Sequence, residues 1–500
     1  MDERYIAAVD LGSSKVAVTV AQAGEKGVQM IYYRETPSEG VRNSYVLNPR
    51  KAADSVRIAL DGAEKELGIK IHQVVTGLPR YEVVQETARA ELERSDPDSS
   101  ITREEIDFLK TNAIDTYPLE QPDKLAIFDI IAQSFTTEED INSRESDVEG
   151  MVSDTLEGTF KVLIGRKRHS DNIDRVMNMV GVAIAKKFFL PQVTAEAVLS
   201  EEERENGVAL IEIGAGATSV AIYHNDILRY FASFPFGGRS ITGDIKLECG
   251  TSEVLAENIK LAFGACMPEK LLTLRDKIIQ IDNPESGSCK QLSVKYLSEV
   301  ITCRTKEIVD ACLYLIQESG LGGSLQAGIV LTGGGASLPN LSTFIKELSG
   351  YSVRIGYPRR KFSFTACSEV NETSATASVG MVMAAKDDKF LNCLSEAPAR
   401  KEKAPAQEES EPTVEQTWSW DDEPVQQEEE ASPEVSQETP VVEEEPRKKE
   451  KKKKEKEKEK PEGLKKKPSI TWATPLRKMG NKISGAVTKL IDEGYDGMES

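Results

Sequence analysis

The sequence has few of the residues from which many metal and redox sites are built. Only three histidines occur among its 500 residues, and their scattered positions show no metal-ligand spacing, so a zinc site is not expected. The seven cysteines form no CxxC pair, and none precedes Cys249. This pattern predicts reduced core thiols and a cytosolic compartment.

Long apolar segments are missing as well. No N-terminal apolar run resembles a signal peptide, and no stretch approaches the roughly 20 apolar residues that a membrane-spanning helix needs. The net charge is −20 and 39% of the residues are apolar, in a chain of 500 residues that is too long for one simple core. We therefore expect a globular protein of several domains or subdomains.

What the sequence has instead is a repeated glycine turn. Residues 208–223 read as a buried strand, a tight loop and a second strand, and residues 5–20 repeat this order. An acidic residue precedes each turn, Asp10 in the first copy and Glu212 in the second. We expect the loops to differ in length, with residues 13–15 in the first and 215–219 in the second. The repeat predicts two related lobes with a ligand held between them.

The chemistry of these turns favours phosphate as that ligand. Glycine and other small residues let backbone N–H groups approach an anion closely. Ser13, Ser14 and Thr218 could add hydroxyl donors, and Lys15 a positive charge. The acid before each turn could hold the water shell of a magnesium ion. An ordinary β-hairpin would explain either turn alone, but two matching turns, each preceded by an acid, favour a nucleotide site.

The rest of the first half alternates between strands and helices. A helix is expected over residues 49–67 and a strand over 71–77, which is an α/β pattern. Residues 80–157 are polar and acidic, and we interpret them as an inserted subdomain with a helix capped by Thr102 and Glu105. Two further elements should follow in the main lobe, a sheet strand and an amphipathic helix, over residues 161–166 and 171–186.

The second half holds a third glycine turn. A strand is followed by four small residues and then by a helix expected over residues 339–350; these four are Gly333, Gly334, Gly335 and Ala336. Bare backbone of this kind lets a flat ligand lie against it. Earlier in this half, Glu257 and Lys260 share one face of an expected helix, where they form either a surface ion pair or contacts to a ribose and base.

The order of these motifs resembles the superfamily of actin, sugar kinases and heat-shock chaperone ATPases. The motifs are Asp10-Leu-Gly-Ser-Ser-Lys15, Glu212-Ile-Gly-Ala-Gly-Ala-Thr218, Glu257-x-x-Lys260 and Leu331-Thr-Gly-Gly-Gly-Ala336. Within it, the chain is similar to the FtsA family of bacterial actin-like cell-division proteins over about residues 4–385. The more particular matches are Gly238 with Ile241-Thr-x-Asp-Ile245, the helix around Arg304 and Glu307, residues 327–333 and residues 375–380.

The resemblance implies an α/β, two-lobed actin-like ATPase fold with an inserted small subdomain. The first lobe would span residues 1–192 and the second 193–390, with a smaller subdomain at about 237–300. ATP and Mg²⁺ would lie between the lobes, with the metal held through water by Asp10 and Glu212. The expected nucleotide-binding residues are Asp10, Gly12, Ser13, Ser14, Lys15, Glu212, Gly214, Ala215, Gly216, Ala217, Thr218, Gly238, Glu257, Lys260, Gly333, Gly334, Gly335 and Ala336.

The sequence departs from the family pattern where hydrolysis would occur. Glu212 replaces the usual Asp, and Leu190 stands where relatives that split ATP carry an acid or glutamine before a proline. Glu196 is the nearest acid downstream, about a helical turn away, and in-line attack tolerates little misplacement. We expect ATP binding with weak or absent hydrolysis. A small-molecule kinase of the same superfamily is the alternative, but it would need a second-substrate pocket with a carboxylate base.

The C-terminal part changes composition. Residues 391–474 are rich in Glu, Lys, Pro and Ser and are expected to be a disordered linker. Glutamates interrupt its lysine run and an acidic block precedes it, which argues against a nucleic-acid arm, so no nucleic acid is expected as a partner. Residues 475–491 predict an amphipathic helix in a membrane interface, with docking on a protein surface as the competing interpretation. The expected lipid-contacting residues are Leu476, Arg477, Lys478, Met479, Lys482, Ile483, Val487, Lys489 and Leu490.

Together these features indicate a structural adaptor. The resemblance implies self-association into filaments, contact with anionic lipid on the cytoplasmic side of the inner membrane at the division site, and binding to the tubulin-like protein FtsZ and to other division proteins. Arg304 and Glu307 match the family's contact helix for FtsZ, although an ordinary solvated helix face has the same spacing.

Overall fold

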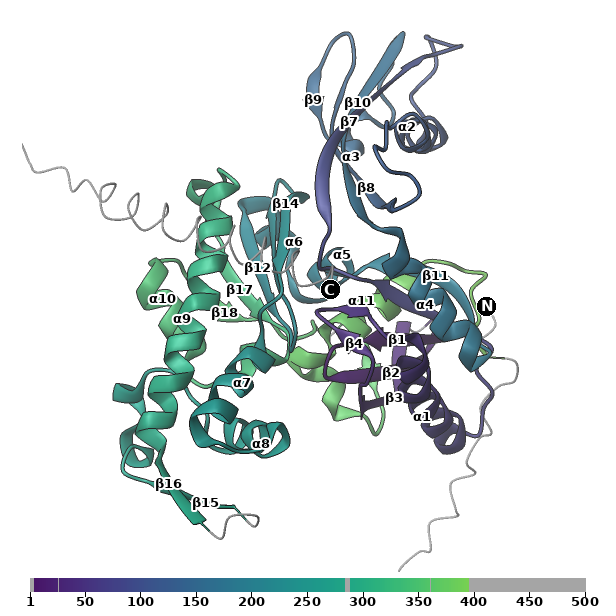
Figure 1. Cartoon of the computed structure of the whole chain (residues 1–500). Helices are drawn as coiled ribbons and strands as arrows, with labels where there is room; N and C mark the ends of the chain where they lie inside the picture. The colour runs from purple at the N-terminus through teal and green to yellow at the C-terminus, as the bar shows by residue number, and fades with distance from the viewer. Residues whose placement is uncertain (1–3, 26, 284–287, 360, 395–500) are drawn as a thin grey trace, which may run out of the picture. The chain divides into compact units, whose positions relative to one another are not determined.

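The computed structural model describes residues 4–25, 27–283, 288–359 and 361–394, which form a mixed α/β fold (Figure 1). Its first sheet has six strands, and β1 pairs antiparallel with β2 but parallel with β6. Their order is β11 (Ala183–Phe189), β6 (Gln73–Leu78), β1 (Arg4–Leu11), β2 (Lys15–Gly24), β3 (Gly27–Pro37) and β19 (Ser363–Phe364). The short hairpin of β4 (Val41–Arg42) and β5 (Tyr45–Val46) follows β3.

Two helices pack together beside this sheet, α1 (Pro49–Leu67) and α4 (Lys167–Val180). Helix α1 has the predicted bounds, because Asn48 caps its first turn and Gly68 ends it in the left-handed conformation. The predicted helix over residues 171–186 is wrong at its end. Gly181 adopts a φ of 85° and stops α4, so residues 183–186 belong to β11 instead.

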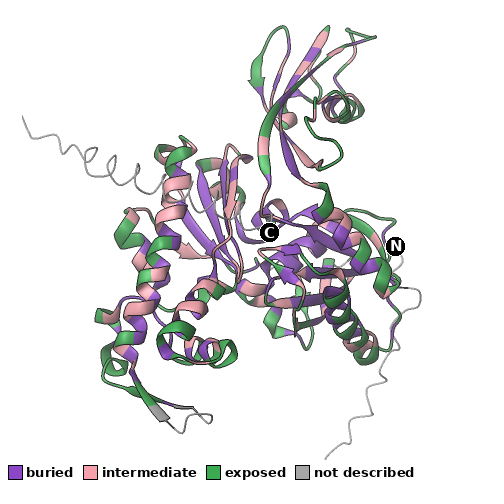
Figure 2. Ribbon diagram, viewed as in Figure 1, coloured by how far each residue is buried: buried purple, intermediate pink, exposed green. Residues whose placement is uncertain are grey.

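The second sheet repeats the layout of the first. Strand β12 pairs antiparallel with β13 and parallel with β17, as β1 does with β2 and β6. Its five strands run in the order β14 (Ile227–Phe234), β13 (Thr218–His224), β12 (Val208–Ile213), β17 (Gly328–Thr332) and β18 (Val353–Ile355). Strand β12 is buried along its whole length, and strands at the centre of this sheet are purple in Figure 2. The sequence repeat therefore corresponds to a repeat of strand topology.

The remaining helices pack against one sheet or the other and against one another. Helix α11 packs against α5 and β1, and α9 packs against α7 and β13. The bounds are α5 (Leu190–Val198), α6 (Glu201–Asn206), α7 (Gly238–Cys249), α8 (Glu253–Phe263), α9 (Val294–Glu318), α10 (Leu341–Ser349) and α11 (Thr376–Ala385). Between α8 and α9 lies a two-stranded hairpin of β15 (Ile278–Asn283) and β16 (Ser288–Ser293). Short 3₁₀ segments are η1 (Pro268–Lys270), η2 (Leu272–Leu274), η3 (Gly322–Ser324), η4 (Gly334–Ser337), η5 (Ser368–Asn371) and η6 (Thr373–Ala375).

A third sheet of four strands lies in the polar stretch of the first half, with its own apolar core around Ile106, Leu109 and Phe160. Its strands are β7 (Val84–Glu93), β10 (Thr155–Arg166), β8 (Leu125–Thr136) and β9 (Ile141–Ser143), accompanied by α2 (Arg103–Asp115) and α3 (Glu145–Val148). The prediction that residues 161–166 resume the main sheet is wrong. They continue β10, whose pairing with β7 and β8 extends to its last residues.

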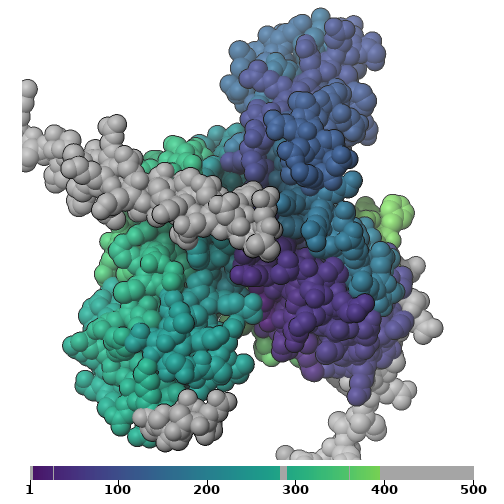
Figure 3. Space-filling model, in the orientation of Figure 1, coloured from purple at the N-terminus to yellow at the C-terminus, as the bar shows by residue number. Residues whose placement is uncertain are grey.

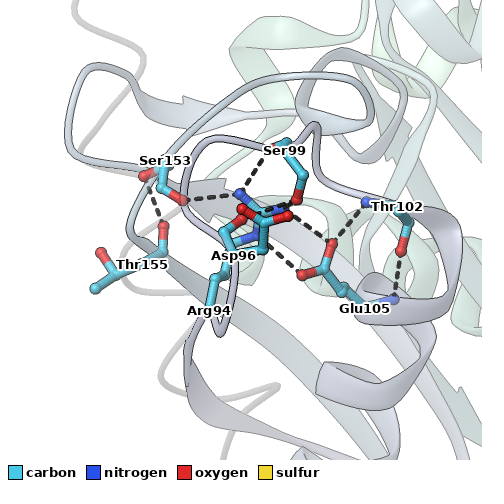
Figure 4. Close-up of polar contacts among 7 residues, drawn as sticks. All are labelled: Arg94, Asp96, Ser99, Thr102, Glu105, Ser153 and Thr155. Atoms are coloured by element: carbon cyan, nitrogen blue, oxygen red, sulfur yellow. Dashed lines mark hydrogen bonds and ion pairs between the residues drawn. The ribbon is translucent and has the colours of Figure 1, made fainter.

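The start of α2 has the predicted capping box, and a buried arginine adds to it (Figure 4). The Glu105 N–H donates to Thr102 Oγ1 at 3.3 Å, and the Thr102 N–H donates to Glu105 Oε2 at 2.8 Å. Arg94 donates to Glu105 at 2.9 Å and to the carbonyl groups of Ser99 and Ser153 at 2.9 and 2.8 Å. These contacts tie the helix to both neighbouring loops.

Two predictions concern the C-terminal part of the chain. The linker from residue 395 onward and the amphipathic helix at 475–491 lie outside the described residues. Among the residues that the structure does describe, no helix combines the length and the apolar character needed to cross a bilayer.

Candidate functional site

The two glycine turns have the same geometry. The Gly12 N–H donates to the Lys15 carbonyl at 2.9 Å, and the Gly214 N–H donates to the Ala217 carbonyl at 3.0 Å. The expected difference in loop length is therefore wrong. Thr218 already pairs with β12 as the first residue of β13, so the small residues after position 217 belong to a strand and not to the loop.

The tips of the two turns contact each other. A Cβ atom on Gly216 would lie 2.7 Å from Ser13 Oγ and 3.0 Å from the backbone N of Asn43, so only glycine fits there. In Figure 3 the purple N-terminal segment borders teal residues from the middle of the chain. Within the described residues, the backbone N–H groups of Ser13, Ser14, Ala215 and Gly216 have no hydrogen-bond acceptor. Free N–H donors from both hairpins are the groups that bind an anion.

The third glycine turn lies against the end of β12, next to the second turn. A Cβ atom on Gly333 would lie 2.6 Å from the Ile213 carbonyl oxygen, and one on Gly335 would lie 2.4 Å from Ile213 Cγ2. Gly334 has more space, since its nearest neighbour would be Ser374 Cβ at 4.0 Å. The structure thus brings the second and third predicted turns together.

Glu257 and Lys260 also lie beside the second turn. Lys260 Nζ donates to Glu257 Oε2 and Thr242 Oγ1, both at 2.8 Å, and to the Gly238 carbonyl at 3.0 Å. The Gly238 N–H in turn donates to the Gly214 carbonyl at 2.9 Å. Glu257 and Lys260 thus form an ion pair, and Gly238 links Lys260 to the second glycine hairpin.

Two of the predicted hydroxyl donors, Ser13 and Thr218, and the ammonium group of Lys15 have partners within the protein. Ser13 Oγ accepts from the Ser44 N–H at 3.0 Å and keeps its own proton, whereas Thr218 donates its proton to the Phe236 carbonyl at 2.8 Å. Lys15 forms an ion pair with Glu35. Burial disfavours the Glu35 carboxylate, but the charge of Lys15 and the hydrogen bonds from Lys15, Tyr33 and Ser374 together hold the Glu35 pKa below its usual range. The Glu35 carboxylate thus offsets part of the positive charge of Lys15 before any ligand binds.

Arg80 is the residue that the sequence analysis missed. Its buried guanidinium forms an ion pair with Glu212, and its carbonyl accepts from Ser233 Oγ at 2.7 Å. Burial raises the pKa of Asp10, and the charge of Arg80 opposes that rise. No motif surrounds Arg80, but its position carried a signal: it follows β6, which runs parallel to β1, so both strands end at the same edge of the sheet.

The acids predicted to hold Mg²⁺ do not fit that role well. A magnesium ion keeps several waters and needs carboxylates that face it. Here Asp10 and Glu212 are only 8% and 6% exposed, and their positive partner is the Arg80 guanidinium. Within the described residues, no group of three or more His, Cys, Asp or Glu could hold a metal ion.

Of the two residues discussed for hydrolysis, Leu190 lines a small pocket together with Asp10, whereas Glu196 lines a different one. Leu190 begins α5, is buried, and packs against Gly77. Glu196 lines a cavity of about 700 Å³ together with Arg204, Tyr223 and Asp226. Burial raises its pKa, and the charges that act on it are those of Arg204, Asp226 and residues 386–387. The charges acting on Asp10 come from a different set, so Glu196 does not join the site at the glycine turns.

Arg304 and Glu307 lie on α9 as predicted, but they differ in availability. The Arg304 guanidinium contacts Asp244 of α7 at 2.6 and 3.0 Å and Glu307 at 2.6 Å. The side chain of Glu307 is 67% exposed, against 29% for Arg304. A partner would therefore meet Glu307 first, with Arg304 already held by α7.

Comparisons with known proteins agree with this architecture. The model of the family "Cell division protein FtsA" matches residues 209–380. The chain is 28% identical over 362 residues to a cell division protein FtsA of Neisseria meningitidis, covering 71% of this chain and 84% of that one. It is 27% identical over 406 residues to the FtsA of Borreliella burgdorferi, covering 81% and 96%.

Among solved structures, the fold is similar to that in a PilM–PilN type IV pilus biogenesis complex. The TM-score is 0.53 at 14% identity, over 76% of this chain and 98% of that one. This likeness bears on the fold, which is that of the actin-like ATPases. The matched family model and the relatives that cover most of the chain confirm the resemblance found in the sequence motifs. Over most of its length the chain is therefore similar to the cell division proteins of the FtsA family.

Proposed function

We propose that this protein binds ATP between its two glycine hairpins, polymerises in that state, and tethers FtsZ filaments to the cytoplasmic membrane. One observation carries the nucleotide part. The tips of two equivalent hairpins meet at Ser13 and Gly216, and four N–H groups without acceptors in the described residues lie in these tips. Such backbone donors suit the phosphates of a nucleotide.

The surroundings of the hairpins suit the rest of the ligand. The third turn offers bare backbone at Gly334, where an added Cβ atom would meet nothing closer than Ser374 Cβ at 4.0 Å, and backbone of this kind suits the face of a flat base. Glu257 is 41% exposed beside Lys260, so its carboxylate is accessible to a ribose hydroxyl. Hydrolysis is expected to be slow, because Leu190 supplies no group that could orient water.

FtsZ recruitment is supported by a surface around α7 and α8. Asp244, which holds Arg304, lies three residues before Leu247, so both share a face of α7. Leu247 is 80% exposed, and Val254 and Leu261 of α8 are each 73% exposed. Exposed apolar side chains of this size beside a charged rim are typical of protein interfaces.

The nucleotide proposal is tested by measuring ATP affinity in solution for the natural chain and for Gly216→Val. A side chain at this position would force the hairpin tips apart, since its Cβ alone would lie 2.7 Å from Ser13 Oγ. We expect the variant to bind ATP at least about tenfold more weakly, because the N–H donors of the two tips could no longer reach one ligand together.

Gly24→Val is the matched control. Gly24 ends β2, and a Cβ atom there would meet nothing within 4 Å. Its ATP affinity should equal that of the natural chain. Equal affinities for Gly216→Val and Gly24→Val would contradict binding between the hairpins, and so would the absence of ATP binding by the natural chain.

A further inference from the structure

The charges at the glycine turns are arranged around an arginine. Asp10 and Glu212 lie at corresponding positions of β1 and β12, and each stands two residues before the first glycine of its turn. Arg80 forms an ion pair with Glu212 and acts on Asp10 by its charge, while its side chain is only 11% exposed. Arg80 therefore acts on both acids of the repeat, and Lys15 adds to its effect on Asp10.

The position of Arg80 is fixed from both sides. Its backbone follows β6 of the first sheet, and its carbonyl accepts a hydrogen bond from Ser233 of β14 in the second sheet. A guanidinium is always charged and presents five N–H donors in a rigid plane. Arg80 Nε is buried and has no hydrogen-bond partner among the described residues. The side chain thus retains a donor beyond the one used for Glu212.

We propose that the Arg80 guanidinium takes the place of a divalent cation at this site, so that the protein binds nucleotide without needing Mg²⁺. The inference rests on the proposed nucleotide binding and adds a specific role to it. Arg80 neutralises the two acids that would otherwise repel the phosphates, and it supplies a charged N–H donor to them. It is a positioning residue between the sheets as well as a phosphate contact.

The first measurement needs no variant. The affinity of the full chain for ATP is compared in excess Mg²⁺ and in excess EDTA. Since the cation is part of the protein, we expect the dissociation constant to change by less than about threefold. A loss of affinity of about tenfold or more in EDTA would overturn the role of Arg80 while leaving nucleotide binding itself in place.

The second measurement uses Arg80→Met, which keeps much of the side-chain volume and removes the charge. It should bind ATP about tenfold more weakly in EDTA and recover affinity in Mg²⁺, because the two released acids can then accept a hydrated ion. Arg34→Met is the control, since Arg34 pairs with Glu66 at the surface and is 61% exposed. An Arg80→Met protein with the same affinity as this control in EDTA would contradict the proposal.

A third readout separates this inference from the proposed function. Electron paramagnetic resonance measures how many Mn²⁺ ions each nucleotide-free protein binds, and the number for each variant is compared with that for the natural chain. Arg80→Met should bind one more Mn²⁺ than the natural chain, and Asp10→Asn added to it should remove that ion. Should the natural chain bind no ATP, the proposed function fails; an extra Mn²⁺ site in Arg80→Met would still support the cation replacement, and its absence would overturn it.

Discussion

Replacing Gly335 by alanine should destabilise the protein, whereas the same change at Gly334 should not. The two residues are neighbours in one turn and differ in what an added methyl group would meet. At Gly335 the Cβ would lie 2.4 Å from Ile213 Cγ2 and 3.0 Å from Ile213 Cβ and the Ile213 carbonyl oxygen. At Gly334 the nearest atom would be Ser374 Cβ at 4.0 Å.

The expected magnitudes follow from these distances. Ile213 is a buried, β-branched strand residue whose side chain has little freedom to move away. Overpacking of this kind costs about 1–3 kcal/mol. A glycine to alanine change also stabilises by about 0.4–1 kcal/mol through the unfolded chain where the backbone permits it. Gly335→Ala should therefore lose about 1–2 kcal/mol net, and Gly334→Ala should be neutral or slightly more stable.

Thermal unfolding of the nucleotide-free proteins measures the difference. For a domain of about 150–250 residues, 1 kcal/mol corresponds to roughly 2–4 °C in Tm. Gly335→Ala should lower the apparent Tm by several degrees relative to Gly334→Ala, with scans at one heating rate for both. Equal Tm values for the two variants would refute the packing of the third turn against β12.

Three further changes probe other parts of the chain. Thr102→Ala removes the cap of α2 and should cost about 1 kcal/mol, seen as faster amide exchange in α2; unchanged protection would contradict the capping role. His169 is buried and its ring stacks on that of Tyr45 at 4.2 Å between centroids, and burial lowers its pKa to about 4, below the unfolded value of 6.5. The stability that neutral His169 contributes is therefore complete above pH 6.5 and is lost as the pH falls toward 4. His169→Phe should flatten the dependence of Tm on pH over that range, and a curve parallel to that of the natural chain would contradict this expectation. Glu307→Lys should weaken FtsZ binding at least several-fold in a pull-down titration, while Glu299→Lys on the same helix should not; equal effects would rule out a specific contact.

Much of the fold could be predicted because its local signals agree with the tertiary structure. The cap and terminal glycine of α1 define its ends, and the paired acids before the turns mark the repeat of β1 and β12. The errors arose where a local pattern was ambiguous. The apolar periodicity after residue 171 continues past Gly181, but the left-handed backbone of that glycine ends the helix.

The site was predictable as a set of glycine turns but not in its charges. Glycines and acids in a repeated order are visible in the sequence, and the contacts of Gly216, Gly333 and Gly335 explain why those positions need glycine. Arg80 is a single residue outside any motif, and its pairing with Glu212 joins positions far apart in the chain. Such a long-range ion pair depends on how the two sheets come together, which no local pattern specifies.

The central claim, that this protein tethers FtsZ filaments to a membrane, is tested most directly by co-sedimentation with vesicles of anionic lipid. FtsZ filaments are mixed with the full chain or with a chain ending before Pro475, with and without ATP. We expect FtsZ to pellet with the vesicles only when the full chain is present, and more strongly with ATP. Equal recovery of FtsZ with the full and the shortened chain, or none with either, would contradict the account.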